Sequence, residues 1–146
     1  MENLTSTWLS EQIVRESCDA IIFSDVDGVI GLWNHGAEEM FGYAAEEAVG
    51  QSLDLIIPEN LRARHCEGYR RVMATGVTRY GKDLLSAPGI RKNGGRMSLE
   101  FSMVVVRDED GAVIGTAAIM RDVTARWEKE KALKARLAAL EGEASP

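Results

Sequence analysis

The chain has 146 residues, of which 45% are hydrophobic and 27% are charged, and its formal net charge is −6. These values predict one soluble globular domain with short extensions, large enough to bury a hydrophobic core. The acidic balance argues against general binding to nucleic acid or to a membrane surface, because both attract basic proteins.

The termini and the cysteines give no sign of export. No apolar run approaches the ~20 residues of a membrane span. The N-terminus has no basic region followed by an apolar run, so we expect no signal peptide and a cytoplasmic location. Cys18 and Cys66 form no C-x-x-C motif, so we expect two reduced thiols.

The first third of the chain predicts a helix, a hairpin and short helical pieces. Residues 5–18 form an amphipathic pattern whose apolar members are Trp8, Leu9, Ile13 and Val14. Two apolar runs then flank Asp27-Gly28, a strong hairpin signal because glycine accepts the positive φ of a tight turn. Glycines break residues 35–57 into short helical segments. His35 follows Asn34, and we expect it to serve in a turn or a helix cap.

A longer helix is predicted from Pro58 to about Ala74, since proline suits a first helical turn. Leu61, His65, Tyr69 and Val72 are spaced by three or four residues and share one helical stripe. The arginines of this segment fall mostly on the other faces. We therefore expect His65 to lie on the apolar side of the helix and to point at a sheet.

After Gly76 the period changes from 3.6 to 2. Met97, Leu99, Phe101 and Met103 alternate with polar residues, which indicates a half-buried strand. Residues 112–124 form a further strand that is apolar on both faces, so we expect its outer side to be covered. The order of helix, two strands, small helices, long helix, three strands and helix predicts an α+β fold, an antiparallel sheet with helices on one face.

The tail has the alanine, lysine and glutamate content of a good helix former. Leu133, Leu137 and Leu140 are spaced by four and then three residues, as in a coiled coil. Two arrangements stay open from the sequence: the tail helix folds back on the sheet, or its leucines form a dimer seam.

From about Arg15 to Thr124 the chain resembles the PAS sensor domain family. The resemblance is carried by the Asp27-Gly28 hairpin, by "WNHGAEEMFGYAAEEAVGQSL", by "RKNGGRMSLEFS" and by the closing "RDVT". It implies a PAS domain over residues 19–124 with a five-stranded antiparallel sheet. Residues 1–18 would be an N-terminal helix and residues 125–146 a C-terminal signalling helix and tail. It further implies a non-enzymatic sensory module of bacterial signalling. Such a module would form a homodimer and pass its signal to a downstream effector domain or partner protein.

PAS domains bind haem, flavins, small acids or nothing, so the fold alone names no ligand. The flavin photoreceptor subgroup needs an Asn-Cys-Arg-Phe stretch that is absent here. Pro58, Arg62, Arg64 and His65 instead resemble the haem-binding PAS domains of bacterial oxygen-sensor kinases. That resemblance implies haem b with His65 as the metal ligand. It also implies that Leu61, Tyr69, Val72, Leu85, Phe101 and Met103 surround the haem and that Arg64 and Arg79 pair with its propionates.

One position departs from that subgroup. Where the oxygen sensors carry an arginine on the strand after the helix, this chain has Leu85, which cannot donate a hydrogen bond. We therefore expect a small gas that depends less on a donor, such as carbon monoxide or nitric oxide, or a redox signal. The alternative is a ligand-free PAS domain that serves dimerisation or partner docking, with His65 a partly buried histidine. The chain has no Walker loop, nucleophile elbow or kinase signature, so we expect no enzyme.

Overall fold

The fold is known from a computed structural model that describes residues 4–78 and 83–144. Its larger helices are α1 (Ser6–Glu16), α2 (His35–Phe41), α3 (Ala45–Ala48), α4 (Arg62–Thr75) and α5 (Thr124–Ala144). Two 3₁₀ segments, η1 (Leu53–Ile56) and η2 (Glu59–Leu61), precede α4. The strands are β1 (Ala20–Asp25), β2 (Ile30–Trp33), β3 (Leu85–Ile90), β4 (Arg96–Arg107) and β5 (Val113–Asp122).

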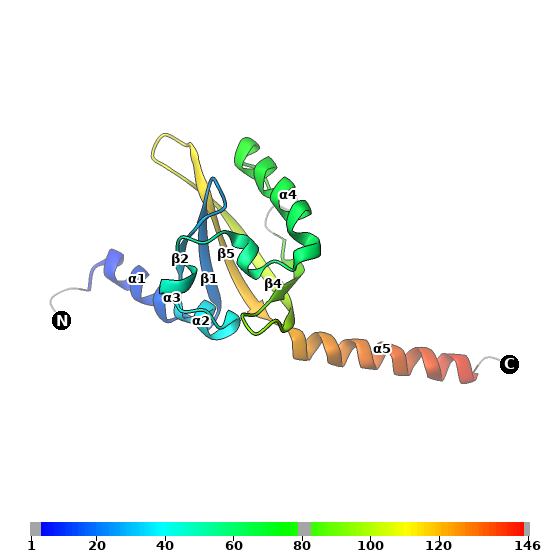
Figure 1. The fold of residues 1–146 in the computed structure, drawn as a ribbon. Coiled ribbons are helices and arrows are strands. Elements are labelled where there is room, and N and C mark those ends of the chain that lie inside the picture. The colour runs from blue at the N-terminus through cyan, green and yellow to red at the C-terminus, as the bar shows by residue number, and fades with distance from the viewer. Residues whose placement is uncertain (1–3, 79–82, 145–146) are drawn as a thin grey trace.

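The five strands form one antiparallel sheet in the order β2-β1-β5-β4-β3 (Figure 1). The predicted α+β fold is thereby confirmed. The hairpin between β1 and β2 also lies where the sequence indicated it. Gly28 has a φ of +77°, and the Asp25 carboxylate accepts hydrogen bonds from the amides of Asp27 and Val29 at 2.9 and 3.0 Å.

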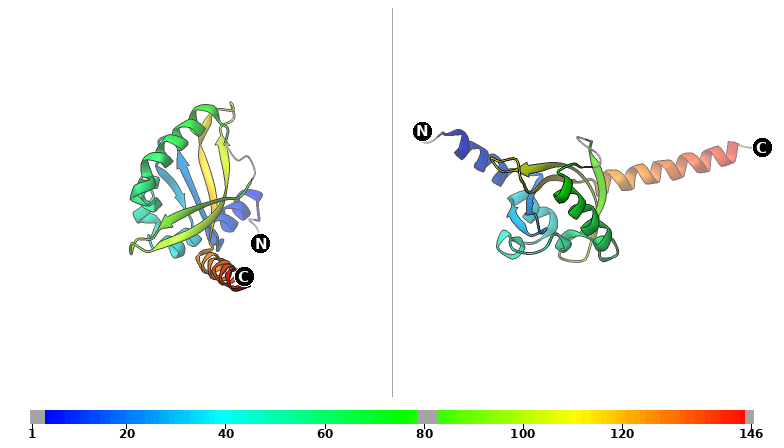
Figure 2. Two further views of the ribbon diagram at one scale, coloured as in Figure 1. Left: turned by 90° about the vertical axis from the view of Figure 1, so that its right-hand side faces the viewer. Right: turned by 90° about the horizontal axis from the view of Figure 1, so that it is seen from above.

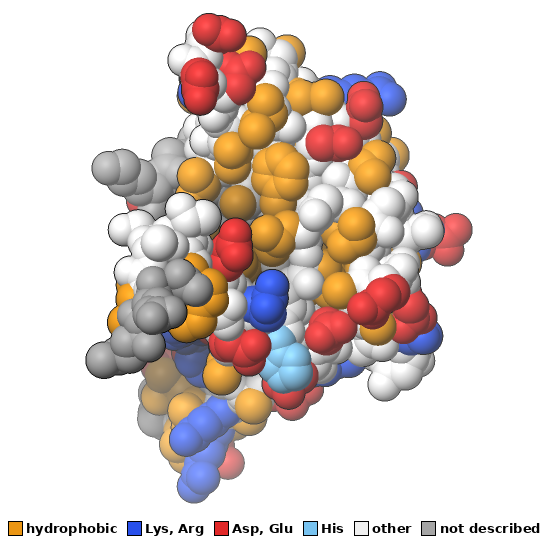
Figure 3. Space-filling view, turned by 90° about the vertical axis from the view of Figure 1, so that its left-hand side faces the viewer, with side chains coloured by type: hydrophobic (Ala, Val, Ile, Leu, Met, Phe, Trp, Pro, Cys, Tyr) orange, Lys and Arg blue, Asp and Glu red, His pale blue; other side chains and the backbone are white. Residues whose placement is uncertain are grey.

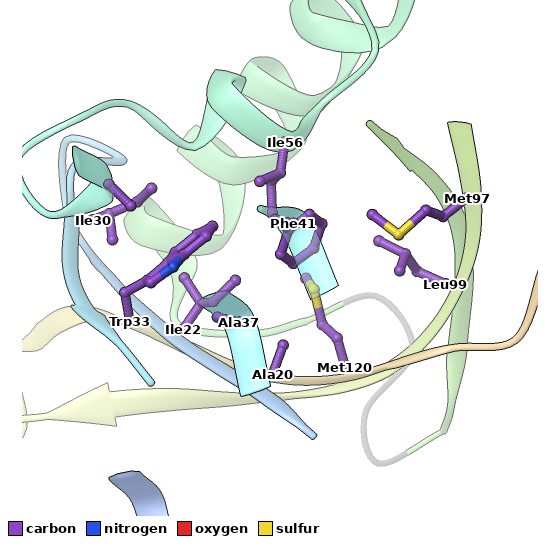
Figure 4. Close-up of a cluster of buried hydrophobic side chains, with 11 residues drawn as sticks. Ala20, Ile22, Ile30, Trp33, Ala37, Phe41, Ile56, Met97, Leu99 and Met120 are labelled. Carbon is purple, nitrogen blue, oxygen red and sulfur yellow. The ribbon is translucent and has the colours of Figure 1, made fainter. Parts of the chain in front are cut away.

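The core lies between the sheet and the short helices. Phe41 of α2 is fully buried, and its ring centroid lies 5.5 Å from that of Trp33 on β2 (Figure 4). The Trp33 indole donates to the carbonyl of Tyr43 at 2.9 Å, so its polar edge is satisfied inside the apolar cluster. Met97 and Leu99 of β4 close the other side of this cluster.

The predicted alternation of β4 is confirmed near its start and weakens along the strand. Met97 and Leu99 are buried and Arg96 is exposed, whereas Phe101 and Met103 on the same inner face are only half-buried. Phe101 packs only against the edge of the core cluster, and Met103 lies beyond it. Helix α4 lies over this farther part of the inner face (Figures 1 and 2).

The two terminal helices project from the domain in opposite directions (Figures 1 and 2). The leucines at 133, 137 and 140 of α5 are 57%, 59% and 53% exposed, so this helix does not fold back on the sheet. The reason is that α5 leaves the sheet from its end and not across its face. None of the helices in the described ranges is long and apolar enough to cross a lipid bilayer.

Candidate functional site

No residue of helix α4 is fully buried, and several polar contacts hold the helix to the rest of the domain. Near its start, Arg62 Nε donates to the carbonyl of Ile57 at 3.1 Å. At its end, Gly76 adopts the left-handed conformation, and Arg107 of β4 donates to the Gly76 carbonyl at 3.0 Å. The helix therefore ends at Gly76, as the sequence indicated, and it crosses part of the inner face of the sheet.

Tyr69 attaches the middle of α4 to the β1–β2 hairpin by hydrogen bonds. Its hydroxyl lies 2.9 Å from the hydroxyl of Ser24 on β1, and it donates to the carbonyl of Asp25 at 2.5 Å. Because the Tyr69 hydroxyl is hydrogen-bonded to the hairpin, the position of Tyr69 sets the distance between α4 and the sheet. The sequence placed Tyr69 on the inward stripe but could not indicate this partner.

His65 lies one turn before Tyr69, with the two ring centroids 6.0 Å apart. It is half-buried, as are Tyr69, Val72 and Met73, so the predicted inward stripe is confirmed by burial. Burial lowers the pKa of His65, and the charge of Asp54 only partly opposes this effect. The imidazole is therefore held neutral at physiological pH, the form in which a histidine can bind a metal.

The remaining residues that the sequence singled out and that the structure describes lie on η2, α4, β3 and β4. Leu61 ends η2 just before α4 and is half-buried. Leu85 begins β3 and pairs with Phe101, while Met103 pairs with Ala118 of β5. Arg64 is exposed. Arg62, which helical periodicity assigned to an outer face, is instead half-buried and bonded to the carbonyl of Ile57. Arg79 lies outside the described residues.

We define the α4-facing surface as five inner-face residues at and beyond the edge of the core cluster: Leu85, Phe101, Met103, Val105 and Thr116. The first four are half-buried, so α4 and the sheet do not close fully on one another. Thr116, which is buried beside Ser24, was missed by the sequence reading, as was the buried hydroxyl of Ser24 itself. A polar residue in an otherwise apolar inward series was the only signal that could have found them.

Two hollows lie away from His65. One, of about 610 Å³, is open between β3, β4 and the first turns of α5, where Pro88 and Trp127 line it. The other, of about 340 Å³, lies beside Phe41 and Lys92. Neither includes a residue of α4.

The junction between β5 and α5 is fixed by the "RDVT" segment. The Thr124 hydroxyl accepts a hydrogen bond from the amide of Ser98 at 2.9 Å, and the Asp122 carboxylate accepts from the Thr124 amide at 3.0 Å and from Arg91 at 2.5 Å. Burial raises the pKa of Asp122, but these bonds from Thr124 and Arg91 outweigh it and hold the pKa below its ordinary value. The bond between Ser98 and Thr124 couples the start of α5 to β4.

In the described part of the chain, no group of three or more His, Cys, Asp or Glu side chains is arranged to hold a metal ion. Haem makes a smaller demand, because its ring supplies four ligands to the iron and the protein needs to supply only one or two. A single neutral histidine beside apolar side chains meets that demand. His65 fits it, and the exposed His35, which pairs with Glu39 at 3.1 Å, does not.

A family model described as the PAS fold matches residues 14–128. A protein of Azorhizobium caulinodans without an assigned role is 31% identical over 134 residues, which are 91% of this chain and 18% of that protein. The sensor protein FixL of Bradyrhizobium diazoefficiens is 43% identical over 47 residues, 32% of this chain and 9% of FixL. The oxygen sensor protein DosP of Escherichia coli is 28% identical over 105 residues, 72% of this chain and 13% of DosP. The chain thus spans less than a fifth of each of these relatives.

Two solved structures share the architecture. The PAS domain of a protein from Colwellia psychrerythraea superposes with a TM-score of 0.72 at 23% identity, covering 83% of this chain and 99% of that one. An RNA-binding light-oxygen-voltage receptor superposes with a TM-score of 0.72 at 23% identity, covering 99% of this chain and 41% of the receptor. At this level of identity both comparisons concern the fold alone.

Proposed function

The chain belongs to the PAS fold family of sensory signalling domains, and from this premise we propose that it binds haem b between α4 and the sheet through His65. The observation that carries the proposal is the state of His65: half-buried, neutral by burial and beside an apolar surface. The likeness to FixL and to the oxygen sensor DosP supports the same ligand. When bound, haem supplies an iron that takes up a diatomic gas or changes its oxidation state.

The protein side of this proposal assigns a task to each element around His65. Leu61, Val72, Leu85, Phe101 and Met103 supply apolar contacts to the ring. The ring of Tyr69 supports His65 from the next helical turn, while its hydroxyl holds α4 against the hairpin. Arg64 is exposed on α4, and with Arg79 it is the proposed partner of the propionates, by charge-assisted hydrogen bonds.

Haem uptake tests this proposal directly. Purified protein titrated with haemin should develop a Soret band, and His65→Ala should abolish most of it because the residue that would hold the iron is removed. His35→Ala is the matched control, since it removes the chain's other histidine from an exposed position. Full haem retention with an unchanged spectrum in His65→Ala would contradict the assignment.

We also propose a homodimer that carries the signal to a downstream effector domain or partner protein. Apolar side chains gather in a band on the face from which α1 projects (Figure 3). Ile13 of α1 is 68% exposed, and Val104 and Ile114 of the sheet are 51% and 41% exposed. A second copy that covers this band would remove apolar area from water. The exposed leucines of α5 would then continue the interface as two parallel helices.

Light scattering tests the dimer. The intact chain should be dimeric at micromolar concentration, and deletion of residues 1–18 should weaken the dimer strongly. A monomeric intact chain would contradict the interface. An unchanged dimer after the deletion would move it to α5.

The second candidate function is a ligand-free PAS domain for dimerisation or docking. It is favoured by the same exposed apolar band and by the position of both hollows away from α4. Protein that stays colourless after addition of haemin, yet forms the dimer, would support this function in place of haem sensing.

A further inference from the structure

A largely buried residue on the α4-facing surface carries a hydroxyl without a hydrogen-bond partner among the described residues. Thr116 of β5 is only 4% exposed and pairs with Ser24 on one side and Val105 on the other. Within residues 4–78 and 83–144, no donor or acceptor is hydrogen-bonded to the Thr116 side chain. Its hydroxyl oxygen is nevertheless not sealed off, because every fully enclosed side-chain polar atom in these ranges has a partner. The hydroxyl oxygen therefore keeps some exposed surface, which a molecule about the size of water can touch.

A short series of contacts connects this hydroxyl with His65. The ring of Tyr69 lies 6.0 Å from the ring of His65, and its hydroxyl lies 2.9 Å from that of Ser24. Ser24 is the cross-strand neighbour of Thr116. Ser24 and Tyr69 satisfy one another and the hairpin carbonyls, so Thr116 is the one hydroxyl of this group that remains available.

Because this oxygen keeps some exposed surface and has no partner among the described residues, its hydroxyl is available to donate a hydrogen bond. Leu85, which stands where the oxygen sensors carry an arginine, is apolar and lies in a different row of the sheet, opposite Phe101. Thr116 lies instead in the row of Ser24, to which the neighbour of His65 is bonded. Of these two positions, the one with an available donor is therefore on β5 and not on β3.

We propose that the Thr116 hydroxyl donates a hydrogen bond to a ligand at the His65 site, a small molecule whose acceptor atom faces the sheet. With haem in place, that small molecule is the diatomic gas. This inference rests on the proposed function, and it assigns the donor role to a residue other than Leu85.

Substitution of Thr116 by valine tests the proposal, because valine keeps the shape and removes the hydroxyl. Ferrous, haem-loaded protein is exposed to carbon monoxide, and the C–O stretching frequency is measured. A donor beside the oxygen lowers this frequency, so Thr116→Val should raise it and Thr116→Ser should largely restore it. Oxygen should dissociate about fivefold faster from Thr116→Val, the loss of one ordinary hydrogen bond.

Tyr69→Phe is the control, since it removes a hydroxyl whose partners are all within the protein. It should lower the stability of the fold, whereas Thr116→Val should not. Normal haem uptake by Thr116→Val with an unchanged C–O frequency and oxygen dissociation rate would overturn this inference and leave the haem proposal standing. A wild-type protein that takes up no haemin would overturn both.

Discussion

Replacement of Asn34 by alanine should destabilise the domain more than any exposed asparagine does. Asn34 is 4% exposed and uses both ends of its amide. Its Oδ1 accepts from the amides of Ile21 and Ala37 at 2.8 and 2.9 Å, and its Nδ2 donates to the carbonyls of Val14 and Asp19 at 2.7 and 3.0 Å. One side chain thus caps α2, fixes the start of β1 and docks the end of α1.

The magnitude follows from these bonds. Loss of the helix cap costs about 1 kcal/mol. An unpaired backbone amide at Ile21 costs about 1–3 kcal/mol more. The sum of about 2–4 kcal/mol should lower the melting temperature by roughly 6–15 °C in a domain of this size.

Thermal and urea unfolding followed by circular dichroism measure this loss. Asn34→Ser, which keeps a capping oxygen but loses the amide donors, should fall between wild type and Asn34→Ala. The matched control is Asn93→Ala, because Asn93 is exposed and accepts one bond, from the Gly95 amide at 2.8 Å. Equal, small losses at positions 34 and 93 would refute the reasoning. Proteolysis near residues 15–19 should also become faster in Asn34→Ala alone, since α1 loses its anchor.

Three further outcomes are expected. Because burial lowers the pKa of His65, the folded state binds a proton there less readily than the unfolded state. The free energy of unfolding should therefore decline as the pH falls below about 6.5, the ordinary histidine pKa. His65→Gln should flatten this decline, and His35→Gln should not. Asp122 has a lowered pKa, so its contribution to the free energy of unfolding is present above its ordinary pKa and is lost as the pH falls through the lower pKa of the folded state. Asp122→Asn should lower the free energy of unfolding by about 1 kcal/mol in urea at neutral pH, and by nothing once acid has protonated Asp122 in the wild type. A methyl group at Gly36 would lie 2.3 Å from the carbonyl oxygen of Asp19. Gly36→Ala should therefore lower the free energy of unfolding by about 1–3 kcal/mol. An equal melting temperature for Gly36→Ala and wild type would contradict that close approach.

Local patterns in the sequence determined the elements of this protein. The Asp27-Gly28 turn, the alternation from Met97 to Met103 and the end of α4 at Gly76 were all predictable. Each depends on backbone geometry within a few residues, which leaves a direct mark on residue order. The inward face of His65 was predictable for the same reason, because helical periodicity is local.

The partners of those residues were decided only by the tertiary structure. Nothing in the sequence near Tyr69 names the carbonyl of Asp25, and nothing near Thr116 indicates that Ser24 lies beside it. Arg107 likewise holds the end of α4 from a distant strand. Such contacts depend on strand order and on the path of the chain between distant segments, and these follow from the packing of the whole core. For the same reason periodicity left open the course of α5, which the structure directs away from the sheet.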